Sequence, residues 1–377
     1  MSCGFRSKFF QNYATRVLPK IGDMEKLRQK EYKKLIILES IIIIVTLYFL
    51  STMLVNFFPH TFGSRPFTQR MEWEIWLAFF APIFAVALIA IAFAIPSSMD
   101  KKFRNKVKES CIFDLVGAFD NISWSPVSIP SSGSNIEGSE LFQYSECKFD
   151  DCFEGTYKGV NFSAAETSLI KEVHTKNGTQ KVIVFKGIIL SFPFSKKINA
   201  HTIIKPNTQV CDTVANVLAV LMILSVLALF VFIPGLWKEL WADKGVDIIF
   251  QGTIYLIGII AAIIGAKKFK KVKLEDVVFD KDYKVQSEDQ IEARYLLTPS
   301  FMERFKNLKK AYNSKDIRCA FFDGQILFAI STKKDLFEIG SLYYPLTDSK
   351  SVNAFYDEIS AIFDIIEEFK LDENTGL

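Results

Sequence analysis

Cysteine and histidine are the residues of this chain best suited to metal binding or nucleophilic chemistry, and both are few and scattered. Cys147 and Cys152 form the one close pair among the six cysteines, with no second pair or histidine cluster beside them. A structural zinc site needs about four such ligands, so we interpret the pair as ordinary thiols. The three histidines, His60, His174 and His201, lie far apart and predict neither a catalytic triad nor a metal centre.

Asp289, Glu292 and Arg294 are the polar residues that most resemble a catalytic group. Ser287 and Gln290, however, have the spacing of a capping box, and acidic residues suit the positive end of a helix. We therefore assign the group to capping, dipole compensation and ion pairing. The sequence also lacks the signatures of phosphate-binding loops, dinucleotide sites, zinc proteases and nucleophile elbows. It predicts no catalytic, cofactor-binding or metal-binding residue, and no cofactor.

The composition indicates membrane segments separated by ordinary soluble sequence. Half of the 377 residues are hydrophobic, yet 23% are charged, as in a soluble protein. The net charge of +3 is too small to predict a nucleic-acid partner.

Four long uncharged segments predict transmembrane helices. They are apolar around their whole circumference, unlike the amphipathic helices of a soluble core, and nineteen helical residues measure about 28 Å, enough to cross the bilayer core. No ionisable residue lies in mid-span, so we favour anchoring over transport. The segments are Ser40–Phe58, Ile75–Pro96, Thr213–Trp237 and Ile248–Ala266.

The distribution of basic residues predicts the orientation of these spans. Seventeen lysines and arginines lie near the span ends on one side, against four in the two short loops. The positive-inside rule then places both termini and residues 97–212 in the cytoplasm. Four tryptophans flank the two short loops, where aromatic rings suit the outer interface: Trp73, Trp76, Trp237 and Trp241. We expect two hairpins in the inner membrane of the cell.

Two-residue turns predict antiparallel hairpins in the soluble part. The turns are Lys158–Gly159, Asn177–Gly178 and Asp323–Gly324. They favour an antiparallel meander over a parallel nucleotide-binding sheet. The expected strands are 153–157, 160–166, 167–175, 181–192, 318–322 and 325–331.

Helices are predicted towards the C-terminus. Thr298 and Pro299 suit the N-cap and first position of a helix. A last helix has one apolar face from Val352 to Phe369, with Asp357, Glu358, Asp364, Glu367 and Glu368 on a face that we expect to be solvated. The predicted fold class is an α+β cytosolic domain, an antiparallel meander plus C-terminal helices, on a membrane anchor of four transmembrane helices in two hairpins.

The predicted domain division follows from these segments. Residues 1–34 form a basic cytoplasmic arm, in which 5–34 is either an amphipathic membrane-surface anchor or a solvated lead-in. The first transmembrane hairpin is 35–97, and the second, 210–268, is inserted between two parts of the cytosolic domain, 98–209 and 269–377. We expect these two parts to fold as one domain; the alternative is two independent domains, each with its own hairpin.

Several stretches resemble a bacterial membrane-anchored family, the domain of unknown function 3137. The longest is Val285–Pro299, and the others are Phe153–Phe162, Val184–Gly187, Val272–Asp276, Phe322–Gly324 and Lys334–Phe337. The resemblance implies an N-terminal membrane hairpin followed by a cytosolic domain, and it implies no activity. Ala200–His201 departs from it by replacing a glycine-containing turn. The second membrane hairpin also departs from it, since it separates two parts that are nearly continuous in similar proteins.

We therefore expect a multi-pass membrane protein that serves as a cytosol-facing binding or scaffolding module. A membrane-proximal enzyme without a recognisable motif and a small transporter stay open as alternatives. The expected partners are the lipid bilayer and an unknown protein or ligand on the cytoplasmic side, with no nucleic acid.

Overall fold

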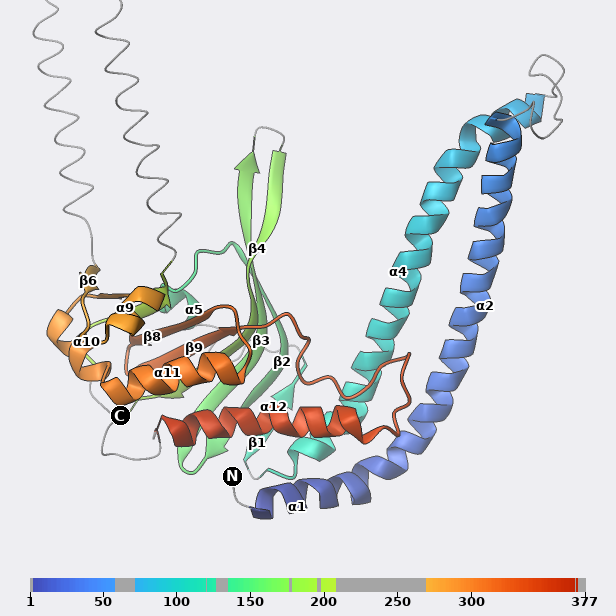
Figure 1. Cartoon of the computed structure of the whole chain (residues 1–377). Coiled ribbons are helices and arrows are strands. Elements are labelled where there is room, and N and C mark those ends of the chain that lie inside the picture. The colour runs from blue at the N-terminus through green and yellow to red at the C-terminus, as the bar shows by residue number, and fades with distance from the viewer. Residues whose placement is uncertain are drawn as a thin grey trace, which may run out of the picture. The chain divides into compact units, whose positions relative to one another are not determined.

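The structure, a computed structural model of the full chain, describes residues 3–57, 72–119, 121–126, 135–175, 178–194, 198–207, 269–369 and 371. The chain divides into two compact units (Figure 1). Unit 1 comprises residues 1–128, 150–157 and 334–365. Unit 2 comprises residues 129–149, 158–333 and 366–377, so the chain enters each unit more than once.

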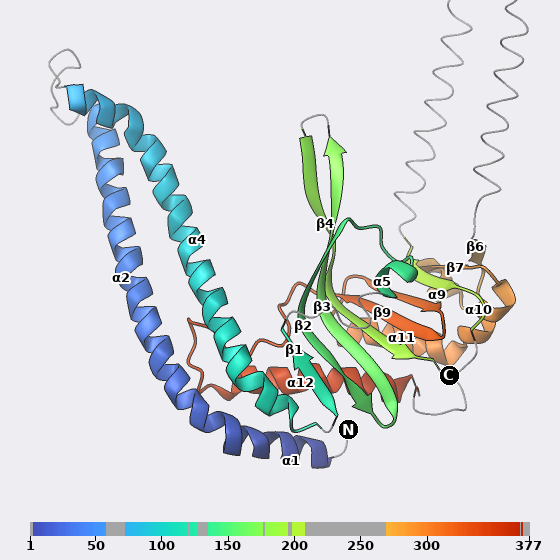
Figure 2. The same cartoon turned by 180° about the vertical axis from the view of Figure 1, so that it is seen from behind.

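Unit 1 is built on long helices. They are α1 (Cys3–Asn12), a π-helical turn (Tyr13–Val17), α2 (Leu18–Phe57), α4 (Glu72–Val116) and most of α12 (Ser349–Glu368). Helices α2 and α4 run side by side in both views of the chain (Figures 1 and 2). As predicted, the apolar face that begins in α12 and ends at Phe369, just after the helix, is buried: Val352, Phe355, Ile359, Ile362 and Phe363 in unit 1, with Ile366 and Phe369 in unit 2.

The N-terminal arm belongs to the core of unit 1. Phe9 is fully buried, with its ring 5.7 Å from that of Phe119 and 5.1 Å from that of Tyr356. Both readings of residues 5–34, a membrane-surface anchor and a solvated lead-in, are therefore wrong for this part of the arm. The reason is that its aromatic residues find a protein core rather than lipid or water.

Two helices in the described part of the chain are long and apolar enough to cross a membrane, not the four predicted over the whole sequence. They are Phe5–Thr52 and Phe80–Val116, judged by length and composition. The predicted span 40–58 lies almost wholly in α2, and 75–96 lies in α4, which continues past Pro96 to Val116. The predicted spans 213–237 and 248–266 lie outside the described residues.

Nine strands form an antiparallel sheet in the described residues, which confirms the α+β class. Their order is β1-β2-β3-β4-β9-β8-β5-β7-β6, so the predicted meander holds only from β1 to β4, after which β9 takes the place beside β4. The strands are β1 (Ile122–Ser125), β2 (Glu146–Tyr157), β3 (Val160–Thr175), β4 (Gly178–Pro193), β5 (Thr202–Pro206), β6 (Lys270–Val272), β7 (Tyr283–Ser287), β8 (Ile317–Phe322) and β9 (Gln325–Ser331).

Two of the three predicted glycine turns lie wholly in the described residues and fall where the sequence predicts them, whereas Asn177 of the third lies outside those residues. Asp323 and Gly324 join β8 to β9 with φ of 47° and 69°, the two positive angles of a tight hairpin turn. Lys158 and Gly159 do the same between β2 and β3. Residues 160–166 and 167–175, predicted as two strands, form the single strand β3.

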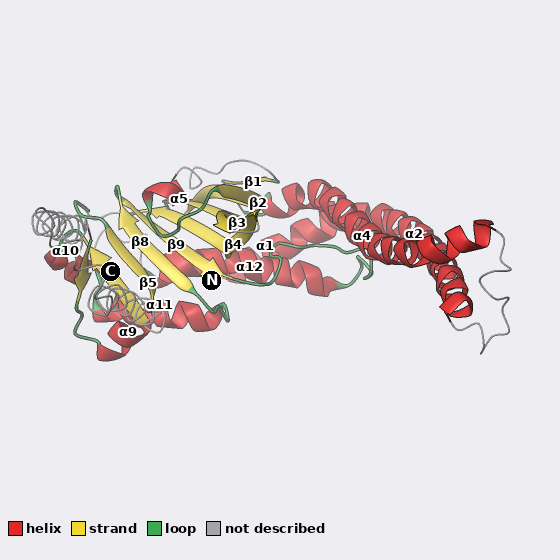
Figure 3. Ribbon diagram, turned by 90° about the horizontal axis from the view of Figure 1, so that it is seen from above, coloured by secondary structure: helices red, strands yellow, loops and turns green. Residues whose placement is uncertain are grey.

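The sheet of unit 2 buries side chains on both faces, because neighbouring residues of a strand point to opposite sides. On one face, Phe321 and Phe328 pack against Phe301 and Phe305 of α11 (Pro299–Ala311). The other face carries a second apolar cluster, which includes Leu141 just after α5 (Asn135–Gly138). Figure 3 shows several of these strands from above, beside the short helices α9 (Val277–Asp282) and α10 (Gln290–Leu296).

Strands from either side of residues 208–268 alternate in unit 2. Strand β5 pairs with both β7 and β8, and β4 pairs with β9. Pro206 lies opposite Tyr283, whereas Lys270 lies opposite Ser287 at the other end of β7. The positions of Pro206 and Lys270 are thus offset by about 14 Å along β7. That the two parts fold as one cooperative domain stays a prediction.

Candidate functional site

The residues that most resembled a catalytic group do not converge on one point. Asp289 is the N-cap of α10, where its Oδ1 accepts a hydrogen bond from Ile291 N at 2.8 Å. Glu292 Oε1 instead accepts hydrogen bonds from the backbone N–H groups of Asn199 and Ala200, at 2.8 and 3.2 Å. Arg294 is exposed. Capping by Asp289 is confirmed, since acidic side chains satisfy free backbone donors at helix starts.

The capping box assigned to Ser287 and Gln290 is wrong. Ser287 is the last residue of β7, and its hydroxyl lies 2.8 Å from Thr202 Oγ1 within the sheet. The strand extends to this residue, so the helix begins only after the cap at Asp289. Thr298, by contrast, caps α11 as predicted and accepts a hydrogen bond from Phe301 N.

Histidine and cysteine take structural positions in the described residues. The Nε2 of His201 donates to Ser139 O at 3.0 Å, and its ring lies 5.5 Å from that of Phe322. Burial raises the pKa of Cys147 to about 11, which keeps the thiol protonated and disfavours the thiolate that metals and nucleophilic catalysis require. Cys152 is buried, and His60 lies outside the described residues. Within those residues no group of three or more His, Cys, Asp or Glu side chains is placed to hold a metal ion.

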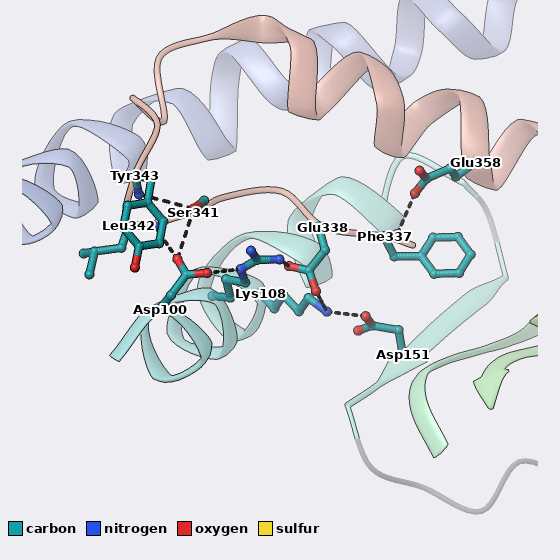
Figure 4. A network of polar contacts seen from close by, with 10 residues as sticks. Asp100, Lys108, Asp151, Phe337, Glu338, Ser341, Leu342, Tyr343 and Glu358 are labelled. Carbon is teal, nitrogen blue, oxygen red and sulfur yellow. Dashed lines mark hydrogen bonds and ion pairs between the residues drawn. The ribbon is translucent and has the colours of Figure 1, made fainter. Parts of the chain in front are cut away.

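A different set of charged residues comes together inside unit 1 (Figure 4). Three belong to α4, one to β2 and one to the segment between β9 and α12. We call this set the charged clamp: Asp100, Arg104, Lys108, Asp151 and Glu338.

Lys108 is at the centre of the charged clamp. Its Nζ donates to Asp151 Oδ2 and lies 2.7 Å from Glu338 Oε1. Asp151 is completely buried, and its other oxygen accepts a hydrogen bond from Trp124 Nε1 at 3.0 Å. Both carboxylate oxygens of Asp151 are thus satisfied, as a buried charge requires.

Asp100 holds the backbone of the segment that follows Glu338. Its Oδ1 accepts hydrogen bonds from Ser341 Oγ at 3.0 Å and from Leu342 N at 2.7 Å. Its Oδ2 accepts from Arg104 Nε at 2.7 Å, and Arg104 also lies 3.7 Å from Glu338. The charged clamp therefore ties α4 to both β2 and the 338–342 segment.

The electrostatics of Lys108 and Asp151 indicate a structural ion pair rather than a reactive site. Burial opposes the charge of Lys108, but the carboxylates of Asp151 and Glu338 outweigh it and raise the Lys108 pKa. A lysine held protonated in this way is neither a nucleophile nor a general base at neutral pH. Burial raises the pKa of Asp151 to about 6, against the opposing effect of Lys108. At neutral pH the two groups form a buried ion pair.

Two residues near the charged clamp have left-handed backbone conformations that favour glycine. They are Asp151, with φ of 46°, and Phe337, with φ of 58°. Phe337 N donates to Glu358 Oε2 at 2.5 Å, and its ring lies 4.6 Å from that of Phe153. Glu358 is therefore not on a solvated face as predicted, because its carboxylate accepts a hydrogen bond from the backbone N–H of Phe337 within unit 1. Strain of this kind persists only where the surroundings hold the residue in place.

Sequence reasoning missed the charged clamp. Lys108 is one of the seventeen basic residues that predict the orientation of the spans, and no sequence motif distinguishes Asp151 or Glu338. One signal was present: Asp151 precedes Cys152 and Phe153 in a strand, where aspartate is disfavoured. The lysine that neutralises it lies 43 positions away, which a local pattern cannot indicate.

Comparison with known proteins identifies a family and no activity. The comparisons with curated proteins and with solved structures found no significant match. A family model described as "Protein of unknown function (DUF3137)" matches residues 183–371. The match contains Val184–Gly187, Val272–Asp276 and the long Val285–Pro299 block, whereas Phe153–Phe162 lies before it. The model covers half of the chain, so this protein belongs to the DUF3137 family of proteins of unknown function.

Proposed function

We propose that this protein is a membrane-anchored binding or scaffolding module, with α2 and α4 as its anchor and its α+β part in the cytoplasm. One observation carries the proposal: α2 and α4 each pass without a break from an exposed apolar stretch into the charged core of unit 1. An anchor that continues as one helix into unit 1 holds unit 1 at a fixed place beside the membrane.

The apolar stretches of the two helices support a lipid environment. Large side chains are exposed there, among them Ile44 (66%), Val86 (68%) and Phe93 (78%). Soluble monomers rarely expose apolar patches of that extent. In a bilayer the same side chains favour insertion by roughly 0.3–0.6 kcal/mol each.

The cytoplasmic halves of these helices are held by ion pairs and hydrogen bonds. Arg28 of α2 pairs with Glu25 at 2.7 Å and donates to Leu342 O at 2.9 Å. Asp100 of α4 binds the N–H of the same Leu342. A movement of one helix against the other would break contacts to this shared residue, which favours a rigid support.

The exposed residues of unit 2 favour a binding role over a catalytic one. Val277 and Ile291 are 80% and 81% exposed, and Val278 and Tyr295 are also exposed. Tyrosine is enriched in protein interfaces, and contiguous exposed apolar patches mark interaction sites. Among the described candidates, by contrast, Asp289 caps a helix, Glu292 binds backbone N–H groups, and Lys108 and Cys147 are held protonated. We propose a protein or small ligand on the cytoplasmic side as the partner, and no nucleic acid.

The test combines membrane extraction with topology reporters in the full chain. We expect the protein to stay in the membrane pellet after alkaline carbonate extraction. Reporters inserted within 126–139 or after Leu377 are expected to behave as cytoplasmic, and a reporter within 59–74 as external. Release by carbonate would exclude the anchor, whereas an external signal from the 126–139 reporter would reverse the orientation.

A further inference from the structure

Residues 334–348, most of the segment between β9 and α12, run along α4 and return along α2 within unit 1. On the way up, Glu338 contacts Lys108, and Leu342 N then contacts Asp100, two turns further along α4. On the way back, Leu346 N donates to Glu25 of α2 at 3.0 Å. Tyr343 and Tyr344 are therefore the apex of the segment, which Figure 1 shows beside the two helices.

The apex lies near the ends of the two predicted spans, on the side that is predicted to be cytoplasmic. Asp100 follows the end of the predicted span, Pro96, by four residues, or about 6 Å of helix. The ring of Tyr343 lies 6.4 Å from that of Tyr32 on α2. Burial raises the pKa of Tyr343, and the carboxylates of Asp100 and Glu39 add to the rise. Tyr32 precedes the start of the first predicted span, Ser40, by eight residues, or about 12 Å of helix, so both helices place the apex within about 12 Å of a predicted span.

Both tyrosines of the apex present surface to the outside. Tyr343 is 44% and Tyr344 is 71% exposed, although the backbone beside them is fixed by Asp100 and Arg28. Tyrosine is enriched at membrane interfaces, because its ring suits the acyl boundary and its hydroxyl suits water and headgroups. Exposed lysines occur at the same level on both helices: Lys33, Lys34, Lys101 and Lys102. They complement the phosphates of anionic lipids.

We infer that Tyr343 and Tyr344 contact the lipid headgroups, as a third membrane contact beside α2 and α4. The inference rests on the proposed function, since it needs these helices to span a bilayer. It assigns the apex a role that the helices lack: two aromatic side chains from the 332–348 segment fix the depth and tilt of unit 1 at the membrane surface.

The test places the photoreactive amino acid p-benzoylphenylalanine at three exposed aromatic positions of the full chain. The positions are Tyr344 at the apex, Phe93 inside the predicted span, and Phe113 on α4. Phe113 is 75% exposed and lies thirteen residues beyond Asp100, about 20 Å further from the bilayer. Each variant is reconstituted in vesicles of equal parts phosphatidylcholine and phosphatidylglycerol, irradiated, and analysed by mass spectrometry for lipid adducts.

We expect lipid adducts at positions 93 and 344 and none at 113. Adducts at 93 without adducts at 344 would overturn the inference and leave the anchor standing. Absence of adducts at 93 would overturn the proposed function and the inference with it. Adducts at 113 equal to those at 344 would show that the apex has no special depth, and would also overturn the inference. Because all three positions are exposed, the substitutions leave the core unchanged, which unfolding transitions equal to that of the unmodified chain would verify.

Discussion

The Lys108–Asp151 pair of unit 1 and Asp289 of unit 2 show two opposite uses of charged residues. In unit 1, Lys108 and Asp151 are buried and bind each other across 43 positions of sequence. In unit 2, Asp289 is at the surface end of a helix and binds a backbone N–H only two positions away. The charged residues of unit 1 hold separate segments together, whereas Asp289 finishes a local element.

This difference has an energetic consequence. A buried ion pair gains little over an apolar pair of the same shape, but the loss of one partner leaves an uncompensated charge and is strongly destabilising. A helix cap contributes about 1 kcal/mol, and its loss exposes a donor to water. A charge change at the Lys108–Asp151 pair is therefore expected to be far more destabilising than one at the Asp289 cap.

The largest effect is expected from Lys108→Met. The methionine leaves the fully buried Asp151 without its cation, which is expected to lower the free energy of unfolding by roughly 3–5 kcal/mol. Chemical denaturation of the full chain in detergent measures this. Lys106→Met is the matched control on the same helix, because Lys106 is exposed, and its effect should stay within about 0.5 kcal/mol. Equal effects of the two variants would contradict the comparison between the units.

A steric change is expected to give the largest effect in unit 2. A Cβ on Gly187 would lie 2.1 Å from Ile330 O and 2.9 Å from Ser331 Cα, both backbone atoms of the neighbouring strand. Gly187→Ala must therefore separate β4 from β9, at a cost of about 3 kcal/mol. Gly324→Ala is the control: its Cβ meets no atom within 4 Å, so only the left-handed φ of 69° opposes it, by about 1 kcal/mol. A thermal shift for Gly324→Ala as large as that for Gly187→Ala would show that conformation, not strand contact, decides.

The stability of unit 1 is expected to depend on pH through the buried carboxyl group of Asp151. The pKa of Asp151 is about 6 in the folded protein and 3.8 unfolded, so between these values the folded state binds more protons. Stability must then fall as pH rises from about 4 to 6, by on the order of 2 kcal/mol for this group. Asp151→Asn removes the titration, and the difference between wild type and variant should change over that window. A difference that is constant from pH 4 to 7 would exclude a raised pKa.

Much of the local structure could be predicted because its causes are local. The Asp323–Gly324 turn needs two positive φ angles, and the Thr298–Pro299 helix start needs a cap and a fixed φ. In both cases adjacent residues meet the requirement. The apolar face of α12 follows from helical periodicity alone. Each of these predictions is confirmed.

The rest depends on pairings between distant segments. Strand β9 lies beside β4 although about 130 residues separate them in sequence, so a meander read from consecutive turns could not place it. The N-terminal arm looked amphipathic, but nothing local tells whether Phe9 meets lipid or Phe119. The charged clamp was hidden for the same reason, since Asp151 and Glu338 appear ordinary until the fold brings Lys108 between them.

The smallest effect is expected from the residues that first resembled an active site. Asp289→Ala removes the cap of α10 and should lower the free energy of unfolding by about 1 kcal/mol, while Asp289→Asn, which keeps the acceptor oxygen, should lower it by less. Arg294→Ala is the neighbouring control, because Arg294 is exposed and its loss should change stability by less than about 0.5 kcal/mol. Urea midpoints of the three variants measure these differences. Equal losses for the alanine and asparagine variants would mean that the negative charge, not the hydrogen bond to Ile291, stabilises this helix. A loss near that of Lys108→Met would mean that a surface cap in unit 2 contributes as much to the free energy of unfolding as a buried ion pair in unit 1. The contrast between the two would then fail.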